Sequence, residues 1–400
     1  MISARAALLA LLVAASSVHA QTADTSDVAP SLRPGVAAYR AGDLATAEQA
    51  LRRLSTGDAN AEAWLGVVLI ERGRSREGLQ ALQHAADAGS AEGIHRLALV
   101  FAQGGEGVPR DEAKALQLFE KAAAAGHRRA QINAGIMRLR GSGATRDLVQ
   151  ARAWLEKAAA QDDPYALYTL GRAMEESAGP ALADPVRAAD LYRRAAQLGH
   201  PQAALRYGLA LNDGIGVRKD PAAAQTWLLQ AQKMGVPEAA LALGDISARL
   251  AVSRDKAANA SALKVAISWY EAAAYAGVAS AQLKLANAYL AGAGVPRDPQ
   301  QTQHWYLRAA NQGLPDAQYA LGIFLTGGMA GANEPVEGYK WLLLAERAGY
   351  VDSRVVREKA AEKIAESDRK RAEALADRFA AQSERPLNDA PPRLAAPGRP

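Results

Sequence analysis

The sequence contains no cysteine, so disulfides cannot stabilise the protein even in an oxidising compartment, and its stability must come from packing. Beyond the first twenty residues it also lacks an uninterrupted apolar stretch of about 18 residues, the length that a membrane-spanning helix requires. These two absences predict a soluble, well-packed mature chain without a transmembrane segment.

The first twenty residues have the pattern of a cleavable secretory signal. One basic residue, Arg5, precedes an apolar run over residues 6–15, and a small-residue pattern ends at Ala20. This arrangement predicts a signal peptide over 1–20 and a periplasmic or secreted mature protein. Lipid attachment of such a protein requires a cysteine at the first mature position, which here is Gln21, so we expect no lipid anchor.

The sequence has little excess charge of either sign. Its formal net charge is +5, and removal of Arg5 with the signal leaves +4 (5 minus 1). Basic residues are interspersed with acidic ones, without the basic stripe and interleaved aromatics of a nucleic-acid-binding surface. We therefore expect no nucleic-acid partner.

Motifs that carry chemistry are also absent. The sequence has no G-x-S-x-G elbow, Walker phosphate loop, H-E-x-x-H or G-x-G-x-x-G, which are local signatures of common hydrolase, nucleotide and metal sites. The histidines after the signal lie in different parts of the sequence, at no ligand spacing: His84, His95, His127, His200 and His304. The sequence thus predicts a protein that is not an enzyme, with no catalytic, cofactor or metal site.

What the sequence does contain is a repeat. Alanine-rich segments end at a recurring anchor position, occupied by Gly89, Gly126, Asp162, Gly199, Gly235, Gly277, Gly313 and Gly349, with intervals of 37, 36, 37, 36, 42, 36 and 36 residues. A period of this length is typical of stacked two-helix units. Residues 249–264 lie in the 42-residue interval, and this insertion either lengthens two helices or forms a protruding loop.

Two kinds of position recur within each unit. Nine residues after the anchor stand only small residues: Ala98, Gly135, Gly171, Gly208, Gly244, Ala286 and Gly322. Eight and seven residues before the closing anchor stand large apolar pairs, such as Trp154-Leu155, Trp269-Tyr270 and Trp341-Leu342. Glycine inside a helix costs about 1 kcal/mol relative to alanine, so its recurrence predicts that large side chains of the second helix pack into small holes on the first. We therefore interpret the recurring tryptophans as core residues.

Glycine turns separate the two helices of a unit, as in residues 105–111, 214–220 and 292–298, which share the pattern G-x-G-V-x-x-D. With A-x-x-x-L-G at Ala166–Gly171 and the W-x-x-K-A-A segment that starts at Trp154, they give the protein a resemblance to the Sel-one-like repeats (SLR), a branch of the tetratricopeptide superfamily. The resemblance covers residues 90–349 as seven units. It implies an all-α fold, a right-handed α-solenoid of stacked helix-turn-helix repeats.

The flanking segments complete the expected organisation. Residues 21–34 are a flexible linker, and residues 35–89 look like tetratricopeptide-type hairpins. Residues 350–382 are expected to form charge-rich capping helices. Residues 383–400 are rich in proline and predict a disordered tail.

The resemblance implies a non-enzymatic scaffold that binds a protein or peptide of the cell envelope on the concave face of the array, lined by the first helix of each unit. Outward positions there give the candidate contact residues Tyr168, Arg172, Arg206, Asp245, Lys284, Asn287 and Tyr319. Secreted SLR proteins suggest two settings, exopolysaccharide export and regulation of a sensor kinase, and the sequence does not choose between them.

Two alternatives come from other classes. Direct polysaccharide binding would use exposed aromatics, of which Tyr168 and Tyr319 are the candidates. A β-lactamase-like hydrolase is suggested by some cysteine-rich SLR proteins, but this protein has no cysteine and lacks the nucleophile set formed by S-x-x-K, S-D-N and K-T-G.

Overall fold

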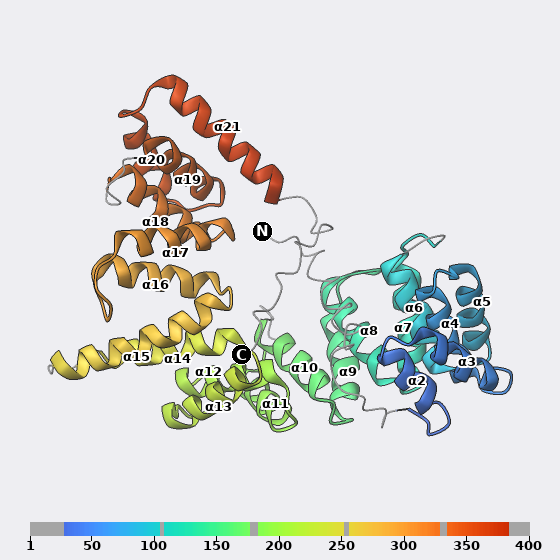
Figure 1. The fold of residues 1–400 in the computed structure, drawn as a ribbon. Coiled ribbons are helices and arrows are strands. Elements are labelled where there is room, and N and C mark those ends of the chain that lie inside the picture. The colour runs from blue at the N-terminus through green and yellow to red at the C-terminus, as the bar shows by residue number, and fades with distance from the viewer. Residues whose placement is uncertain (1–27, 105–107, 177–182, 252–255, 329–333, 384–400) are drawn as a thin grey trace, which may run out of the picture. The chain divides into compact units, whose positions relative to one another are not determined.

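A computed structural model describes residues 28–104, 108–176, 183–251, 256–328 and 334–383 of the protein. Every element in these ranges is a helix, from α2 to α21 (Figure 1), which confirms the all-α repeat fold. The predicted signal peptide, residues 21–27 of the linker and residues 384–400 of the predicted tail lie outside the described residues.

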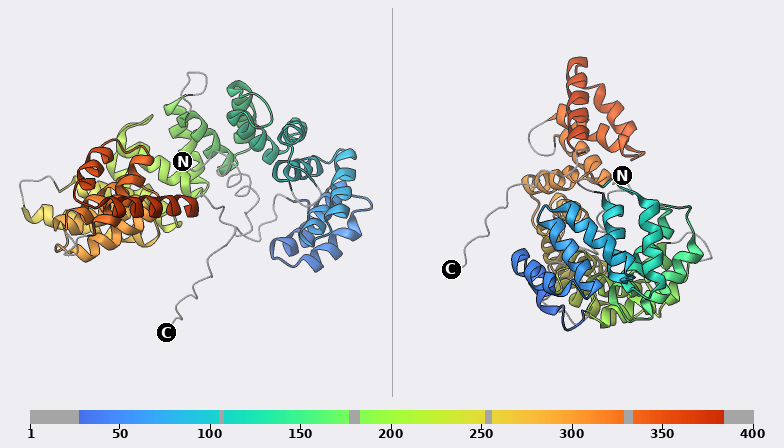
Figure 2. Two further views of the ribbon diagram at one scale, coloured as in Figure 1. Left: turned by 90° about the horizontal axis from the view of Figure 1, so that it is seen from above. Right: turned by 90° about the vertical axis from the view of Figure 1, so that its right-hand side faces the viewer.

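The protein divides into two compact units, Met1–Asp220 and Pro221–Pro400. The first contains α2 (Arg33–Arg40), α3 (Leu44–Leu54), α4 (Ala59–Glu71), α5 (Ser75–Asp87), α6 (Ala91–Gln103), α7 (Glu112–Ala124), α8 (Arg128–Arg140), α9 (Leu148–Ala159), α10 (Pro164–Glu176), α11 (Pro185–Gln197) and α12 (Pro201–Asp213). The second contains α13 (Pro221–Lys233), α14 (Pro237–Arg249), α15 (Lys256–Tyr275), α16 (Ala279–Ala291), α17 (Pro299–Asn311), α18 (Pro315–Thr326), α19 (Pro335–Arg347), α20 (Ser353–Ala361) and α21 (Glu366–Ser383). Within each unit, successive hairpins stack in sequence order (Figures 1 and 2). No helix in the described ranges is long and apolar enough to cross a membrane.

Each hairpin joins a first helix, such as α8 or α14, to an antiparallel second helix, such as α9 or α15. Some first helices end at glycines in the left-handed region, for example Gly141 at φ 72° and Gly292 at φ 74°. Several second helices begin at aspartates whose side chains accept backbone N–H bonds, as Asp298 does from Gln300 and Gln301. These caps satisfy backbone groups that have no partner within the helix.

The small-residue slots hold the two helices of a hairpin close together. A Cβ added to Gly135 would lie 2.6 Å from Cγ of Leu155, and one added to Gly244 would lie 2.6 Å from the ring of Tyr270. The side chain that fills the hole is thus the second of the recurring large pair. The preceding tryptophan is fully buried at Trp305 and Trp341, each 2% exposed, whereas the others are partly exposed: Trp154, Trp227 and Trp269.

The second glycine of the turn between the two helices of a hairpin allows close packing between adjacent repeats. A Cβ on Gly143 would lie 2.2 Å from the carbonyl oxygen of Glu112, and one on Gly216 would lie 1.9 Å from that of Pro185. Each of these turns therefore presses its backbone onto the start of the preceding second helix, and any side chain there would separate adjacent repeats.

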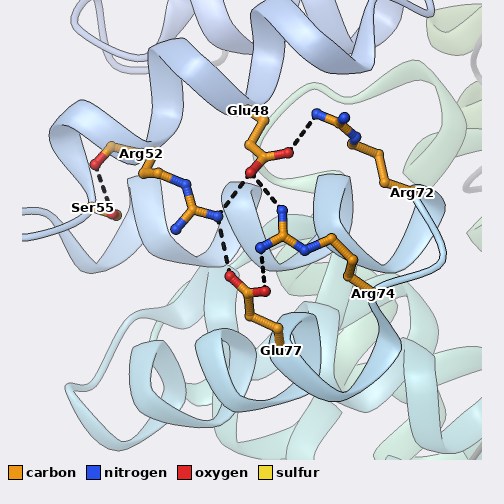
Figure 3. Close-up of polar contacts among 6 residues, drawn as sticks. All are labelled: Glu48, Arg52, Ser55, Arg72, Arg74 and Glu77. Carbon is orange, nitrogen blue, oxygen red and sulfur yellow. Dashed lines mark hydrogen bonds and ion pairs between the residues drawn. The ribbon is translucent and has the colours of Figure 1, made fainter.

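An ion-pair network joins the N-terminal hairpins. The carboxylate oxygens of Glu48 on α3 lie 2.8 Å from a guanidinium nitrogen of Arg52, 2.5 Å from one of Arg72 and 2.8 Å from one of Arg74. Glu77 on α5 pairs with both Arg52 and Arg74 (Figure 3). The Glu48 side chain is only 12% exposed. This network fixes α3 against the turn between α4 and α5.

The insertion lengthens one helix. α14 has 13 residues, the same length as the first helices α6, α8, α10, α12 and α16, whereas α15 has 20 residues. Second helices in other repeats begin fourteen residues before the closing anchor, which corresponds to Leu263, so residues 256–262 extend α15 beyond this point. Residues 252–255 lie outside the described ranges.

Candidate functional site

Three of the predicted contact residues lie on neighbouring first helices of the first unit. The ring of Tyr168 on α10 stacks on His200, with ring centroids 4.4 Å apart. Arg206 on α12 pairs with Glu175 at 3.4 Å, and Glu175 also accepts the hydroxyl of Tyr192 at 2.6 Å. Arg172 is partly exposed on α10. Tyr168 and Arg206 therefore take part in contacts between helices.

The other four lie in the second unit and behave similarly. Asp245 on α14 accepts from the hydroxyl of Tyr270 at 2.7 Å and pairs with Lys284 of α16 at 3.1 Å. Asn287 accepts from the hydroxyl of Tyr306 at 2.5 Å. The ring of Tyr319 stacks on Tyr350 with centroids 4.4 Å apart. Their role in partner binding stays a prediction.

The described residues also form a cluster that the sequence analysis missed. Glu92 and His95 on α6 and His127 at the start of α8 bring their carboxylate and ring atoms within 4.8 Å of one another. Histidines that lie in different repeats and at no ligand spacing in the sequence are thus brought together in the case of His95 and His127. The two lie 32 residues apart in sequence (127 minus 95), but stacking of repeats places the starts of α6 and α8 side by side.

Local helix capping positions this cluster. Nδ1 of His127 accepts the backbone N–H of Ala130 at 3.2 Å, and its Nε2 lies 2.8 Å from Glu92. Because Nδ1 accepts, Nε2 carries the proton of the neutral ring and donates to Glu92. Glu92 also accepts from Nε of Arg96 at 2.5 Å. Burial would raise the pKa of Glu92, but Arg96 and His127 hold this pKa well below its usual range.

His95 is the buried member of the cluster and is only 5% exposed. Its ring stacks on His127 with centroids 4.4 Å apart and planes 25° apart, and its Nε2 lies 3.3 Å from the Asn133 amide. Its Nδ1 has no hydrogen-bond partner among the described residues. Burial, assisted by His127, holds the pKa of His95 well below that of a free histidine.

The donor set does not fit a metal ion. Coordination by Nε2 of His127 would require a proton on Nδ1, which would break the cap on Ala130. The planes of the His95 and His127 rings are also too nearly parallel for a nitrogen lone pair of each to point at one ion. The carboxylate of Glu92 is already paired with the positive charge of Arg96. The arrangement is a hydrogen-bonded cap between repeats.

A cavity of about 410 Å³ opens beside the cluster. Its wall consists of the segment before α2, α4, the starts of α6 and α8, and a residue that follows α9. The lining residues are Val28, Ala29, Leu32, Asn60, Trp64, Ala91, Glu92, His127, Arg128, Arg129 and Gln161. None of the seven predicted contact residues lines it. No motif within one repeat indicates it, because Glu92 and His127 stand three and one residues after the anchors of two consecutive repeats.

Stacked two-helix units held by small-residue slots define an α-helical repeat protein. The sequence matches the Sel1 repeat over residues 91–127, 128–163, 164–200, 201–236, 237–278, 279–314 and 315–350. Because these segments cover more than half of its length, the protein belongs to the Sel1 repeat family, as the resemblance indicated.

Similar solved structures share this fold. A Sel1 repeat protein from Oxalobacter formigenes is 28% identical, and the match covers 78% of this protein and 90% of that one, with a TM-score of 0.64. A protective antigen of uropathogenic Escherichia coli with an SLR fold is 24% identical, and the match covers 94% of this protein and 85% of that one, with a TM-score of 0.64. The latter likeness concerns the fold alone.

Among curated proteins, this one is similar to an ERAD-associated E3 ubiquitin-protein ligase component of Arabidopsis thaliana, HRD3B. The match is 34% identical over 102 residues, or 25% of this protein and 16% of that one. The protein thus spans only about a sixth of this relative. Sel1 repeat proteins act as protein–protein interaction scaffolds and are generally not catalytic.

Proposed function

We propose that this protein is a non-enzymatic scaffold of the periplasm that binds an envelope protein or peptide along its first helices. The observation that carries the proposal is the series of seven consecutive Sel1 repeats, whose first helices hold polar side chains in fixed positions. Arg206 is held by Glu175 and Lys284 by Asp245. Ordered polar groups of this kind lose little side-chain entropy when a partner binds.

The periplasmic location rests on residues 1–20, where one basic residue, an apolar run and a small-residue cleavage pattern follow in order. It predicts that the protein isolated from its native cells begins at Gln21. Intact mass measurement of the purified protein tests this point directly. A mass that retains residues 1–20 in a cytoplasmic fraction would refute the location but leave the scaffold proposal intact.

Partner binding is tested by site-specific photocrosslinking in the native envelope. A photoreactive amino acid at Arg206 or Lys284 should crosslink one reproducible envelope protein, identified by mass spectrometry. The control position is Val149 on α9, which is 72% exposed and lies on a second helix. Equal recovery of the crosslinked protein from all three positions, or no recovery from the two positions on first helices, would contradict binding along the first helices. The partner's identity separates an export component from a sensor kinase.

Polysaccharide binding gains little support from the two tyrosines proposed for it. Tyr168 and Tyr319 each have one ring face covered, by His200 and Tyr350 respectively. A sugar could therefore stack on one face of each ring only. We propose the protein partner as the function.

A further inference from the structure

We infer that the exposed face of α20, at the end of the last repeat, binds a segment of the partner in which an arginine lies next to an aliphatic side chain. This inference rests on the proposed function, because the occupant is taken to be part of the bound protein or peptide. Among the predicted contact residues, only Tyr319 belongs to this end surface. The residues of the end surface are Asp316, Tyr319, Tyr350, Val351, Asp352 and Val355.

In three repeats, the side chain six residues after an anchor stacks on the side chain one residue after the next anchor. The ring centroids are 4.4 Å apart in each of these pairs, which are His95 on His127, Tyr168 on His200 and Tyr319 on Tyr350. After the last anchor, Gly349, the residue at the first of these two positions is Val355. A repeat that followed α20 would therefore cover Val355.

The described part of the chain provides no such repeat. Instead, α21 packs on α19, where the ring of Phe379 contacts that of Trp341 with centroids 5.2 Å apart. α20 also lacks the small-residue slot that receives a second helix, because Glu358 stands nine residues after the anchor. Val355 is 56% exposed, and Val351, four residues earlier, is 86% exposed. The array thus ends in an apolar face that the described residues leave open to a partner.

Two exposed carboxylates beside this face have no counter-ion among the described residues. Asp316 lies three residues before Tyr319 on α18, so their side chains share one face of that helix. Asp352 is the N-cap residue of α20, but its side chain accepts no capping hydrogen bond. Partial burial and then the charges of Asp316 and Asp352 raise the pKa of Tyr350, as expected if both acids lie near its ring. Unpaired carboxylates beside an apolar surface favour a cationic partner group.

The basic side chains of α20 do not take the place of that partner group. Two of them form ion pairs, Arg354 with Glu358 at 3.0 Å and Arg357 with Glu346 at 2.6 Å. Lys359 stands in the last turn of α20, seven residues beyond Asp352 (359 minus 352) and about 10 Å away along the helix axis. The end surface therefore has negative charge at the start of α20, which directs the basic group of the occupant to the tyrosine pair.

Arginine fits this position better than lysine. Its planar guanidinium presents several N–H donors, enough to reach two carboxylates, and it also stacks on aromatic rings. Tyr350 is partly exposed and supplies such a ring near both acids. An aliphatic residue next to the arginine then covers Val351 or Val355.

The test measures the fluorescence polarisation of fluorescein-labelled peptides with the full mature protein. The probe peptide has Leu-Arg-Val at its centre, between serine and glycine residues, and its counterparts have lysine or glutamine in place of the arginine. Because ion pairs between exposed groups are weak, the arginine peptide should bind only about fivefold more tightly than the glutamine peptide. The lysine peptide should lie between them, and added salt should reduce the preference because it screens exposed charges.

Two variants and two controls locate the binding. The double variant Asp316→Asn, Asp352→Asn should lose the preference for arginine. Glu238→Gln should retain it, because Glu238 is also exposed and stands three residues after its anchor, but lies in another repeat. Val355→Asn should weaken the binding of all three peptides by about threefold, whereas Val186→Asn, at a valine of α11 that is 67% exposed, should not. Circular dichroism confirms that each variant is folded.

Equal binding of the arginine and glutamine peptides, or saturable binding of neither, would overturn the inference. So would an arginine preference that survives the double aspartate substitution. A preference that emerges only after removal of residues 384–400 would assign the face to the protein's own C-terminal segment. A dimer that Val355→Asn dissociates would assign it to a second copy, and both results contradict a partner segment. If photocrosslinking from Arg206 and Lys284 still recovers an envelope protein in these cases, the proposed scaffold function stands and only the end-surface assignment fails.

Discussion

The side-chain amide of Gln312, at the end of α17, donates a 2.8 Å hydrogen bond to Oε1 of Gln282 on α16. Gln282 in turn donates to the carbonyl of Ala274 at 3.0 Å. The pair Gln161 and Gln131 repeats this arrangement at 2.9 Å. In each pair, an amide near the end of a second helix bonds to a buried glutamine of the preceding first helix.

The third position of this kind is incomplete. Gln318 donates to the carbonyl of Ala310 at 3.2 Å, but its Oε1 is buried without a partner among the described residues. The reason is that Ala348 occupies the donor slot that Gln161 and Gln312 fill, one residue before the anchor.

Ala348→Gln should therefore stabilise the protein. The backbone of Ala348 (φ −80°, ψ 1°) matches that of Gln312 (φ −81°, ψ 2°), so the new amide can reach Oε1 of Gln318 in the same way. A hydrogen bond that satisfies a buried acceptor contributes about 1 kcal/mol. Urea unfolding of Ala348→Gln should show a gain of this size in the free energy of unfolding. The control is Ala125→Gln, where Ile94 replaces the receiving glutamine, and an equal gain there would contradict this reason.

Glycine at the second position of a turn should be far less replaceable than glycine at an anchor. Gly216 and Gly199 both have positive φ, 68° and 87°, so alanine at either costs about 1–2 kcal/mol in backbone conformation. At Gly216 the added Cβ would also lie 1.9 Å from the Pro185 carbonyl, whereas nothing lies within 4 Å at Gly199. Gly216→Ala should lower the free energy of unfolding by at least about 2 kcal/mol more than Gly199→Ala. Similar losses in urea unfolding would show that the turn does not press on α11.

Much of the fold could be predicted because its packing depends on residue size at fixed spacing. A glycine at 135 or 171 leaves a hole that one large side chain must fill, and small residues recur at this slot in every unit. The sequence did not reveal which member of the large pair enters the hole. This depends on helix rotation, which places Leu155 and Tyr192 against the glycines and leaves Trp154 partly exposed.

The candidate site was largely unpredictable for a different reason. Asp245 and Asn287 are exposed or partly exposed polar residues on first helices, as expected, but tyrosines reaching past the small-residue slots use them as acceptors. The cavity depends on contacts between repeats. Glu92 and His127 come together only when consecutive repeats are stacked, so no local motif could indicate them.

The Glu48 network should contribute measurably to stability, because the Glu48 carboxylate pairs with three guanidinium groups, two of which also pair with Glu77. The hydrogen bond from Arg52 and the neighbouring Arg74 hold the pKa of Glu48 below its usual value. The side chains of its three arginine partners are 39–48% exposed. Because solvent screens their charges, Glu48→Gln should lower the free energy of unfolding by about 1 kcal/mol. Glu77→Gln, at a more exposed position, should cost less, and 0.5 M NaCl should narrow the difference. An equal loss for both variants would indicate no special role for the partly buried carboxylate.

Acid should destabilise the protein through His200. Burial lowers the pKa of His200 from 6.5 to about 4, and its Nδ1 caps α12 by accepting the N–H of Ala203 at 3.2 Å. Because protonation favours the unfolded state, the stabilisation is complete above pH 6.5 and is lost as the pH falls towards about 4. Because proton binding is linked to unfolding, the free energy of unfolding should fall by on the order of 2–3 kcal/mol between pH 7.5 and pH 4.5.

His200→Asn keeps a capping acceptor but removes the titrating group, so its free energy of unfolding should fall less over the same pH range. The matched control is His84→Asn, because the hydrogen bond from His84 to Glu62 raises the pKa of that exposed histidine. His84 therefore stabilises the fold at low pH, and its contribution is lost as the pH rises. Urea unfolding at pH 7.5 and pH 4.5 should show a weaker pH dependence for His200→Asn and no weakening for His84→Asn. Identical pH dependence in His200→Asn and the wild type would show that buried groups other than His200 cause the acid sensitivity.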